Sequence, residues 1–134
     1  MCLMVYVASD KSLPLIKWDE NKRAFCVSDL SKYEKNVAAQ FKLPYVYTAG
    51  SHLGCGCGFL KNFKDEEGLA QSNENYLQLS AYLQKARETE ATIHIYSCWD
   101  GDQEAKPVFR EKIDLKHLVE SIFEFKEKAL YEIL

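Results

Sequence analysis

Residues 45–59 read YVYTAGSHLGCGCGF, and this stretch contains both a predicted strand and the candidate functional loop. Its first five residues, 45–49, are mostly aromatic or β-branched, which is typical of a β-strand. Four glycines follow within nine residues, a density that excludes a stable helix and an ordinary strand. The stretch therefore predicts a strand that runs directly into a glycine-rich loop, residues 50–59, and this loop carries Cys55 and Cys57.

Apolar runs and apolar periodicity predict the remaining strands and helices. Short apolar or alternating runs predict four further strands, at 2–8, 25–27, 91–98 and 108–110. Capping residues and apolar spacings of three and four predict three helices: one that starts at Ser31 and ends before Pro44, one that starts at Ser72 or Asn73, and one over 114–133 capped by Asp114. The Asp100-Gly101 turn predicts that strand 108–110 pairs antiparallel with strand 91–98.

The order of these elements predicts the fold class. We expect a small α/β domain, with α+β as the alternative, in which three helices cover a mixed sheet of about four to five strands. The length of 134 residues suits a single domain over 1–134. Because helices separate several strands, at least one connection must cross over. Strands 45–49 and 91–98 are therefore expected to run parallel as neighbours or near neighbours.

The composition excludes several classes of protein. Hydrophobic residues make up 47% of the chain and charged residues 28%, close to the globular average and unlike collagen, low-complexity or disordered chains. A net charge of -3 and the lack of clustered basic residues argue against a nucleic-acid partner. The apolar run at the N-terminus is too short to span a membrane and has no basic residues before it, so we expect neither a signal peptide nor a membrane partner.

The cysteines indicate a reduced protein. Five cysteines are an odd number and about 4% of the chain, below the roughly 8–10% of a disulfide scaffold. We therefore expect a cytoplasmic protein with free thiols. Cys2 and Cys26 lie in predicted strands and are expected to face the core, since free cysteine is among the most buried residue types.

The remaining cysteines predict a site at one end of the sheet. In an open α/β sheet, ligands bind beyond the carboxyl ends of the parallel strands. The loop 50–59 leaves one such end and Cys98 lies at another, so His52, Cys55, Cys57 and Cys98 are expected to converge there. Three thiolates and one imidazole suit tetrahedral zinc. The spacing is unusual, because one residue separates Cys55 from Cys57 where two to four are common.

Other interpretations of the loop stay open at this stage. Amides of a glycine loop can lower a thiol pKa and bind an oxyanion, which makes Cys55 or Cys57 a candidate nucleophile and His52 its base. The same two cysteines are also candidates for a reversible redox pair. Alternatively, they pack as small hydrophobes beneath a tight turn. A nucleotide site is not supported, because the glycine spacing departs from Gly-x-Gly-x-x-Gly and no Walker A lysine is present.

Two functions follow from these patterns. The first is a small cytoplasmic domain whose loop 50–59 binds a metal ion or presents a thiol. The alternative is a non-catalytic interaction or dimerisation module with structural cysteines. The helix expected over 114–133 is apolar around much of its circumference, which makes it the candidate surface for a homodimer.

Overall fold

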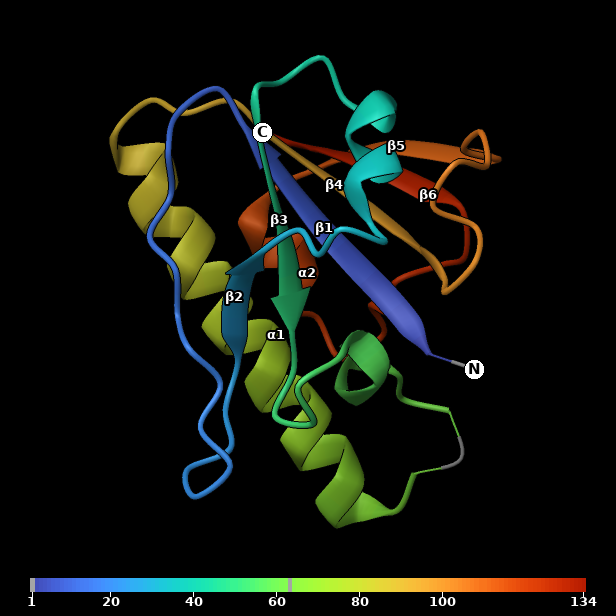
Figure 1. The fold of residues 1–134 in the computed structure, drawn as a ribbon. Coiled ribbons are helices and arrows are strands. Elements are labelled where there is room, and N and C mark those ends of the chain that lie inside the picture. Colours follow the sequence, from blue (N-terminus) through green and yellow to red (C-terminus); the bar gives the residue numbers. More distant parts are fainter. Residues whose placement is uncertain (1, 63) are drawn as a thin grey trace.

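A six-stranded mixed sheet with the strand order β2-β3-β1-β4-β6-β5 forms the centre of the molecule (Figure 1). The computed structural model describes residues 2–62 and 64–134. The strands are β1 (Leu3–Ser9), β2 (Cys26–Asp29), β3 (Tyr45–Gly50), β4 (Ile93–Trp99), β5 (Phe109–Ile113) and β6 (Ala129–Ile133). The helical elements are the 3-10 turns η1 (Lys35–Gln40) and η2 (Gly56–Phe59) and the α-helices α1 (Glu66–Glu88) and α2 (Leu115–Leu118). The expected mixed sheet is confirmed, with six strands rather than four or five.

The first strand lies in the middle of the sheet. Val5 of β1 pairs with Ala49 of β3 on one side and with Ser97 of β4 on the other, and both pairings are antiparallel. β1 is a nearly continuous apolar run because neighbouring strands and both layers bury it. Since β3 and β4 both run opposite to β1, they run parallel to each other with one strand between them. The expectation that these two strands are parallel near neighbours is confirmed.

The predicted hairpin between β4 and β5 is wrong. β5 pairs in parallel with β6, and β6 pairs antiparallel with β4, so β6 separates the two strands that were expected to meet. The segment after the Asp100-Gly101 turn is held elsewhere. The hydroxyl of Tyr96 donates to the carbonyl oxygen of Ala105 at 2.8 Å, and Gln40 of η1 donates to the same oxygen at 2.6 Å. These bonds draw the chain toward η1 instead of back along β4.

The helix expected over 114–133 is also wrong. Asp114 does cap a helix, because its side chain accepts a hydrogen bond from the amide of His117 at 2.9 Å, but α2 ends after one turn. The chain then becomes irregular and ends in β6. Lys128 has a φ of 48°, a conformation that no right-handed helix contains. The predicted dimer surface therefore does not exist as a helix, and a homodimer stays a prediction without assigned residues.

Aromatic packing explains why this segment does not form the expected helix. The rings of Phe123 and Phe125 lie 5.4 Å apart, and that of Phe125 lies 5.6 Å from Tyr131. Successive odd positions share one side of an extended chain, whereas residues two apart point to different sides of a helix. All three side chains are buried in the main core. The core therefore gains three aromatic side chains that a helix would have pointed in different directions.

Two layers cover the two faces of the sheet (Figure 1). The long helix α1 buries Tyr76, Leu79, Leu83 and Ala86 against one face, as the sequence periodicity predicts. The cap is earlier than expected: Asp65, rather than Ser72 or Asn73, accepts a hydrogen bond from the amide of Gly68 at 2.8 Å. None of the helices in the described residues is both long and apolar enough to cross a membrane.

The opposite face carries a smaller core around η1. Val37 and Phe41 are buried there with Tyr6, Tyr96 and Cys98. The expected helix from Ser31 is a 3-10 turn instead, although the amide of Ser31 does donate to Glu34 at 3.3 Å as a capping box requires. The face that carries Cys98 therefore lies opposite the face that carries α1, which matters for the site.

Candidate metal centre

The pairing of β1 with β3 brings the start of β1 to the glycine loop. Because the two strands are antiparallel, the start of β1 lies beside the end of β3, where the loop begins. The turn η2 packs directly on β1: a Cβ atom added to Gly56 would clash with the carbonyl oxygen of Leu3. Only glycine permits this close approach of two backbones. Cys2, one residue before β1, is consequently placed at Cys55 and Cys57.

Three thiols form the group of potential metal ligands. The Sγ atoms of Cys2, Cys55 and Cys57 all lie within 4.8 Å of one another. Cys2 is exposed, and the other two are half-buried. All five cysteines of the chain lie in its described part and are free thiols. The group is therefore a cluster of reduced sulfur atoms that opens to the surface.

Ser51 holds the loop in the shape that presents the two central thiols. Its side chain is fully buried, and its amide and its hydroxyl both donate to the carbonyl oxygen of Cys55, at 2.8 and 2.5 Å. The hydroxyl oxygen also accepts a hydrogen bond from the amide of Gly58 at 3.0 Å. Gly54 turns the chain with a φ of 85°, a conformation that favours glycine. Residues 51–58 are thus closed around one buried hydroxyl.

The imidazole of His52 has another role. The Asn75 side-chain oxygen accepts from the amide of His52 at 3.0 Å, which fixes the orientation of the Asn75 amide group. The Asn75 nitrogen lies 2.8 Å from Nδ1 of His52, so Nδ1 must accept and Nε2 must carry the proton. Burial, followed by the nearby charge of Lys64, lowers the pKa of His52. His52 is therefore a neutral anchor between the loop and α1, and the structure does not bring it into the thiol group.

Cys98 lies apart from the group as well. Side chains along a strand alternate between faces, and Cys98 belongs to the smaller core under η1. Burial, with a further contribution from Asp102, raises the pKa of its thiol to about 12. The expected convergence fails because β1 separates β3 from β4 and because Cys98 lies on the face of the sheet opposite α1. The structure thus brings together two of the four residues expected at the site, Cys55 and Cys57.

The expectation for the first two cysteines is half right. Cys26 is buried, as expected, and burial raises the pKa of its thiol. Cys2 was expected to face the core and is exposed instead, because β1 begins at Leu3 and leaves Cys2 outside the alternation of the strand. No local pattern indicates Cys2 as a ligand. The antiparallel register of β1 and β3 was the signal that would have placed it beside the loop.

Lys64 supplies a positive charge next to the thiols. Burial lowers the pKa of its ammonium group, and the proximity of Cys57 and Glu124 opposes this shift. Its Nζ donates to the hydroxyl of Ser72 on α1 at 2.7 Å, which holds the charge near the cluster. Thiolates are the form that binds metals and attacks electrophiles. The chemistry of the cluster is therefore that of soft sulfur ligands beside one lysine.

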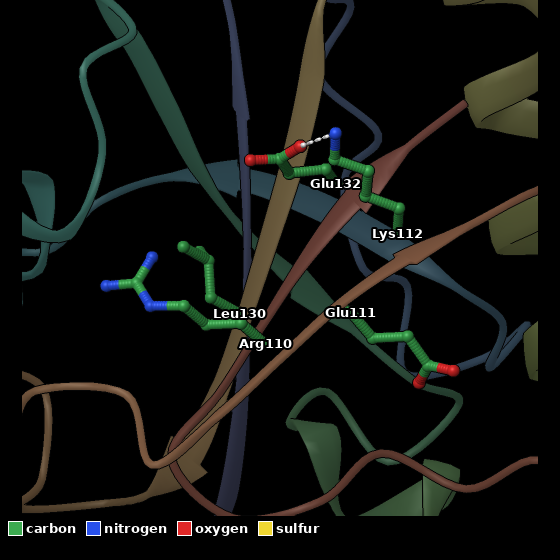
Figure 2. A pocket seen from close by; sticks show the side chains of 5 residues that line it. All are labelled: Arg110, Glu111, Lys112, Leu130 and Glu132. Atoms are coloured by element: carbon green, nitrogen blue, oxygen red, sulfur yellow. Dashed lines mark ion pairs between the residues drawn. The ribbon is translucent and has the colours of Figure 1, made fainter.

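A hollow that is separate from the thiol cluster lies at the β5–β6 edge of the sheet (Figure 2). It has a volume of about 180 Å³ and is lined by Arg110, Glu111 and Lys112 of β5 and Leu130 and Glu132 of β6. Lys112 and Glu132 form an ion pair of 3.9 Å in which both side chains are exposed, and Glu111 points away from the other four side chains (Figure 2). An exposed pair of this kind contributes little binding energy. This hollow has no thiol or imidazole in its lining.

Comparisons of the chain with protein-family models, curated proteins and solved structures found no match. The protein is therefore described by its fold and its candidate site alone. This is a small protein with a mixed six-stranded sheet, and a cluster of three cysteines at one end of that sheet could hold a metal ion.

Proposed function

We propose that this protein binds one thiophilic metal ion, with zinc as the first choice, through Cys2, Cys55 and Cys57. The observation that carries the proposal is the convergence of three Sγ atoms within 4.8 Å of one another. These residues come from two segments more than fifty positions apart.

The geometry is close to that of a thiolate site. A Zn–S bond of about 2.3 Å in a tetrahedral site separates neighbouring sulfur atoms by about 3.8 Å. The thiols need to close by about 1 Å at most to reach that spacing. Rotation about the Cα–Cβ bond of exposed Cys2 supplies such a movement, while the buried bonds of Ser51 keep the loop in place. Soft thiolates select zinc, copper(I) and iron–sulfur clusters over magnesium or calcium.

Charge supports the same assignment. Three thiolates place three negative charges within a few ångströms, which is unfavourable without compensation. A divalent cation removes most of that repulsion, and Lys64 beside Cys57 offsets part of the remainder. Free thiols also fit a reducing compartment, and we accordingly propose the cytoplasm as the location of the protein.

The test is a metal analysis of the chain purified without a histidine tag and kept reduced. We expect about one zinc ion per chain, measured by elemental analysis and by competition with a chromogenic chelator. Serine in place of Cys2, Cys55 or Cys57 should each weaken zinc binding at least about tenfold, because each change removes one of three ligands. Circular dichroism establishes that each variant is folded.

The controls separate this ligand set from the one that the sequence alone predicts. Cys98→Ala and His52→Ala should retain zinc, since neither side chain belongs to the cluster. Loss of zinc in either folded control, or retention in Cys2→Ser, would contradict the three-cysteine assignment. A wild-type chain that binds no zinc and no copper(I) would refute the proposal and favour a non-catalytic interaction module with structural cysteines.

A further inference from the structure

We infer that a metal ion at this centre keeps one coordination position open to solvent, and that a small external thiol occupies it. This inference rests on the proposed function and adds the class of ligand that the site receives. It depends on three observations: which donors the chain supplies, where the nearest unused donors are held, and which side of the cluster is exposed.

The chain supplies three ligands to an ion that takes four. Zinc in proteins is almost always four-coordinate, and sites with four protein ligands are closed, whereas sites with three leave a position for water or substrate. Within residues 2–62 and 64–134, Cys2, Cys55 and Cys57 form the one group in which three or more potential ligand atoms converge, and it contains no fourth member. Among the described residues a fourth ligand would require a rearrangement of the chain, and the alternative is a ligand from outside.

His52 is the nearest imidazole in the sequence, and its lone pair is already engaged. Nδ1 accepts the hydrogen bond from Asn75, and Nε2 carries a proton and has no lone pair to offer a metal. Asn75 is itself held, because it accepts from the amide of His52 and donates to the carbonyl oxygen of Gly58 at 3.2 Å. Recruiting His52 would require breaking its bond to Asn75, which is almost completely buried.

Cys26 is the remaining thiol near the loop, and it is trapped beneath the sheet edge. It pairs with Gly50 at the junction of β2 and β3, where its Sγ atom fills the space that a Gly50 side chain would need. The backbone of Gly54 closes the same space. Cys26 is 6% exposed. Its Sγ atom is packed against the Gly50 and Gly54 backbone and lies outside the group of three thiols, so it is not the fourth ligand in this arrangement.

The open position faces water. Cys2 precedes β1 and is exposed, and Cys55 and Cys57 are half-buried, so the cluster lies at the surface rather than in a sealed cavity. Leu53, in the same loop, is 49% exposed, so the loop itself lies at the surface. A small molecule with a sulfur atom and a short carbon chain can therefore reach the ion without movement of the fold.

The charge of the centre favours binding of an external thiol and disfavours activation of a bound water molecule. Three thiolates and Zn²⁺ carry a net charge of -1, so the ion is a weak Lewis acid and lowers the pKa of bound water little. A thiol ligand loses its proton to solvent, its sulfur forms a bond to zinc, and the bound water leaves. The site thereby converts an external thiol into a bound thiolate.

The experiment uses the full chain loaded with Co²⁺, whose sulfur-to-metal charge-transfer band reports the number of thiolate ligands. Addition of 2-mercaptoethanol to the wild-type complex should raise that band by about one third, as three Co–S bonds become four. Ethylene glycol, which has hydroxyls in place of the thiol, should leave the spectrum unchanged. Cys26→Ala should give the same starting spectrum and the same response as the wild-type chain.

Each outcome bears on a different claim. If the wild-type spectrum does not respond to 2-mercaptoethanol, the chain itself closes the site and the open position is overturned. The same follows if the charge-transfer band of Cys26→Ala is a quarter weaker than that of the wild-type complex, because Cys26 is then a fourth ligand. Extraction of Co²⁺ by the thiol also overturns it, because the external ligand then competes with the protein instead of joining it. If Co²⁺ does not bind at all, the proposed function fails first, and the two failures are distinguishable.

Discussion

Replacing Tyr76 with phenylalanine removes one buried hydroxyl that joins α1 to the support of the candidate metal centre. That hydroxyl donates to the carbonyl oxygen of Phe59, the last residue of η2, at 2.7 Å, and accepts from the amide of Phe125 at 3.1 Å. Tyr76 is 1% exposed, so water does not replace these bonds. Phenylalanine keeps the ring and its edge contact with Phe59, so the change isolates the hydroxyl.

The magnitude follows from the two groups that lose their partner. Leaving a buried backbone amide or carbonyl unsatisfied costs about 1–3 kcal/mol, so the loss of both partners in Tyr76→Phe should lower the free energy of unfolding by about 2–6 kcal/mol. With a typical urea dependence of about 2 kcal/mol per molar, the midpoint of urea unfolding should fall by about 1–3 M. Fluorescence-detected urea unfolding of the reduced protein measures this directly.

Tyr33→Phe is the matched control. Tyr33 is 82% exposed, and its ring contact with Lys32 survives the substitution, so its unfolding free energy should change by less than about 0.5 kcal/mol. A loss of the same small size in Tyr76→Phe would refute the reasoning, because it would mean that the two backbone groups find other partners. A full loss should be accompanied by weaker metal binding, since the end of η2 is then released.

Two further predictions follow from the packing. Gly56→Ala should destabilise the fold by about 1–3 kcal/mol and weaken metal binding, because the new Cβ would clash with the backbone of Leu3. Thermal unfolding and zinc titration measure the two effects. An unchanged thermal midpoint and an unchanged zinc affinity would contradict the close packing of η2 on β1. The buried thiol of Cys98 should make the protein less stable as pH rises from about 9 toward 12, because the unfolded chain releases this proton near its ordinary pKa while the folded chain keeps it up to about 12. The free energy of unfolding measured across this pH range should fall less steeply in Cys98→Ala than in the wild-type chain, and equal slopes would contradict the raised pKa.

The parts of the fold that follow from local pattern were predictable. The apolar run of β1 and the spacing of Leu79 and Leu83 in α1 each reflect burial of one element against a large neighbour, which the sequence records directly. The segment 114–133 shows where this reasoning fails. Its apolar residues are spaced like those of a helix, yet Ile122 is 84% exposed, so the spacing does not describe one buried face. Tertiary packing of aromatic rings decided that segment.

The candidate site was half predictable for a related reason. Cys55 and Cys57 are marked by the glycines around them, because a dense glycine loop at a strand end is a local signal. Cys2 carries no local signal, since its position depends on the register of two strands that lie forty residues apart in the chain. Cys98 was included because β3 and β4 were expected to be parallel neighbours or near neighbours, but its side chain lies in the smaller core on the face opposite α1. The insertion of β1 between them is a property of the whole sheet and moves the site from Cys98 to Cys2.

The central position of β1 in the sheet also affects how the protein folds during its synthesis. This strand leaves the ribosome before its two neighbours in the sheet, and its second partner, β4, ends at Trp99, some ninety residues later. At about 5–20 residues per second, β1 waits roughly 5–20 s before both of its edges are covered. During synthesis its apolar residues remain available to other chains and to chaperones. Strand β1 is thus held open longer than β3, which can pair with it as soon as it appears.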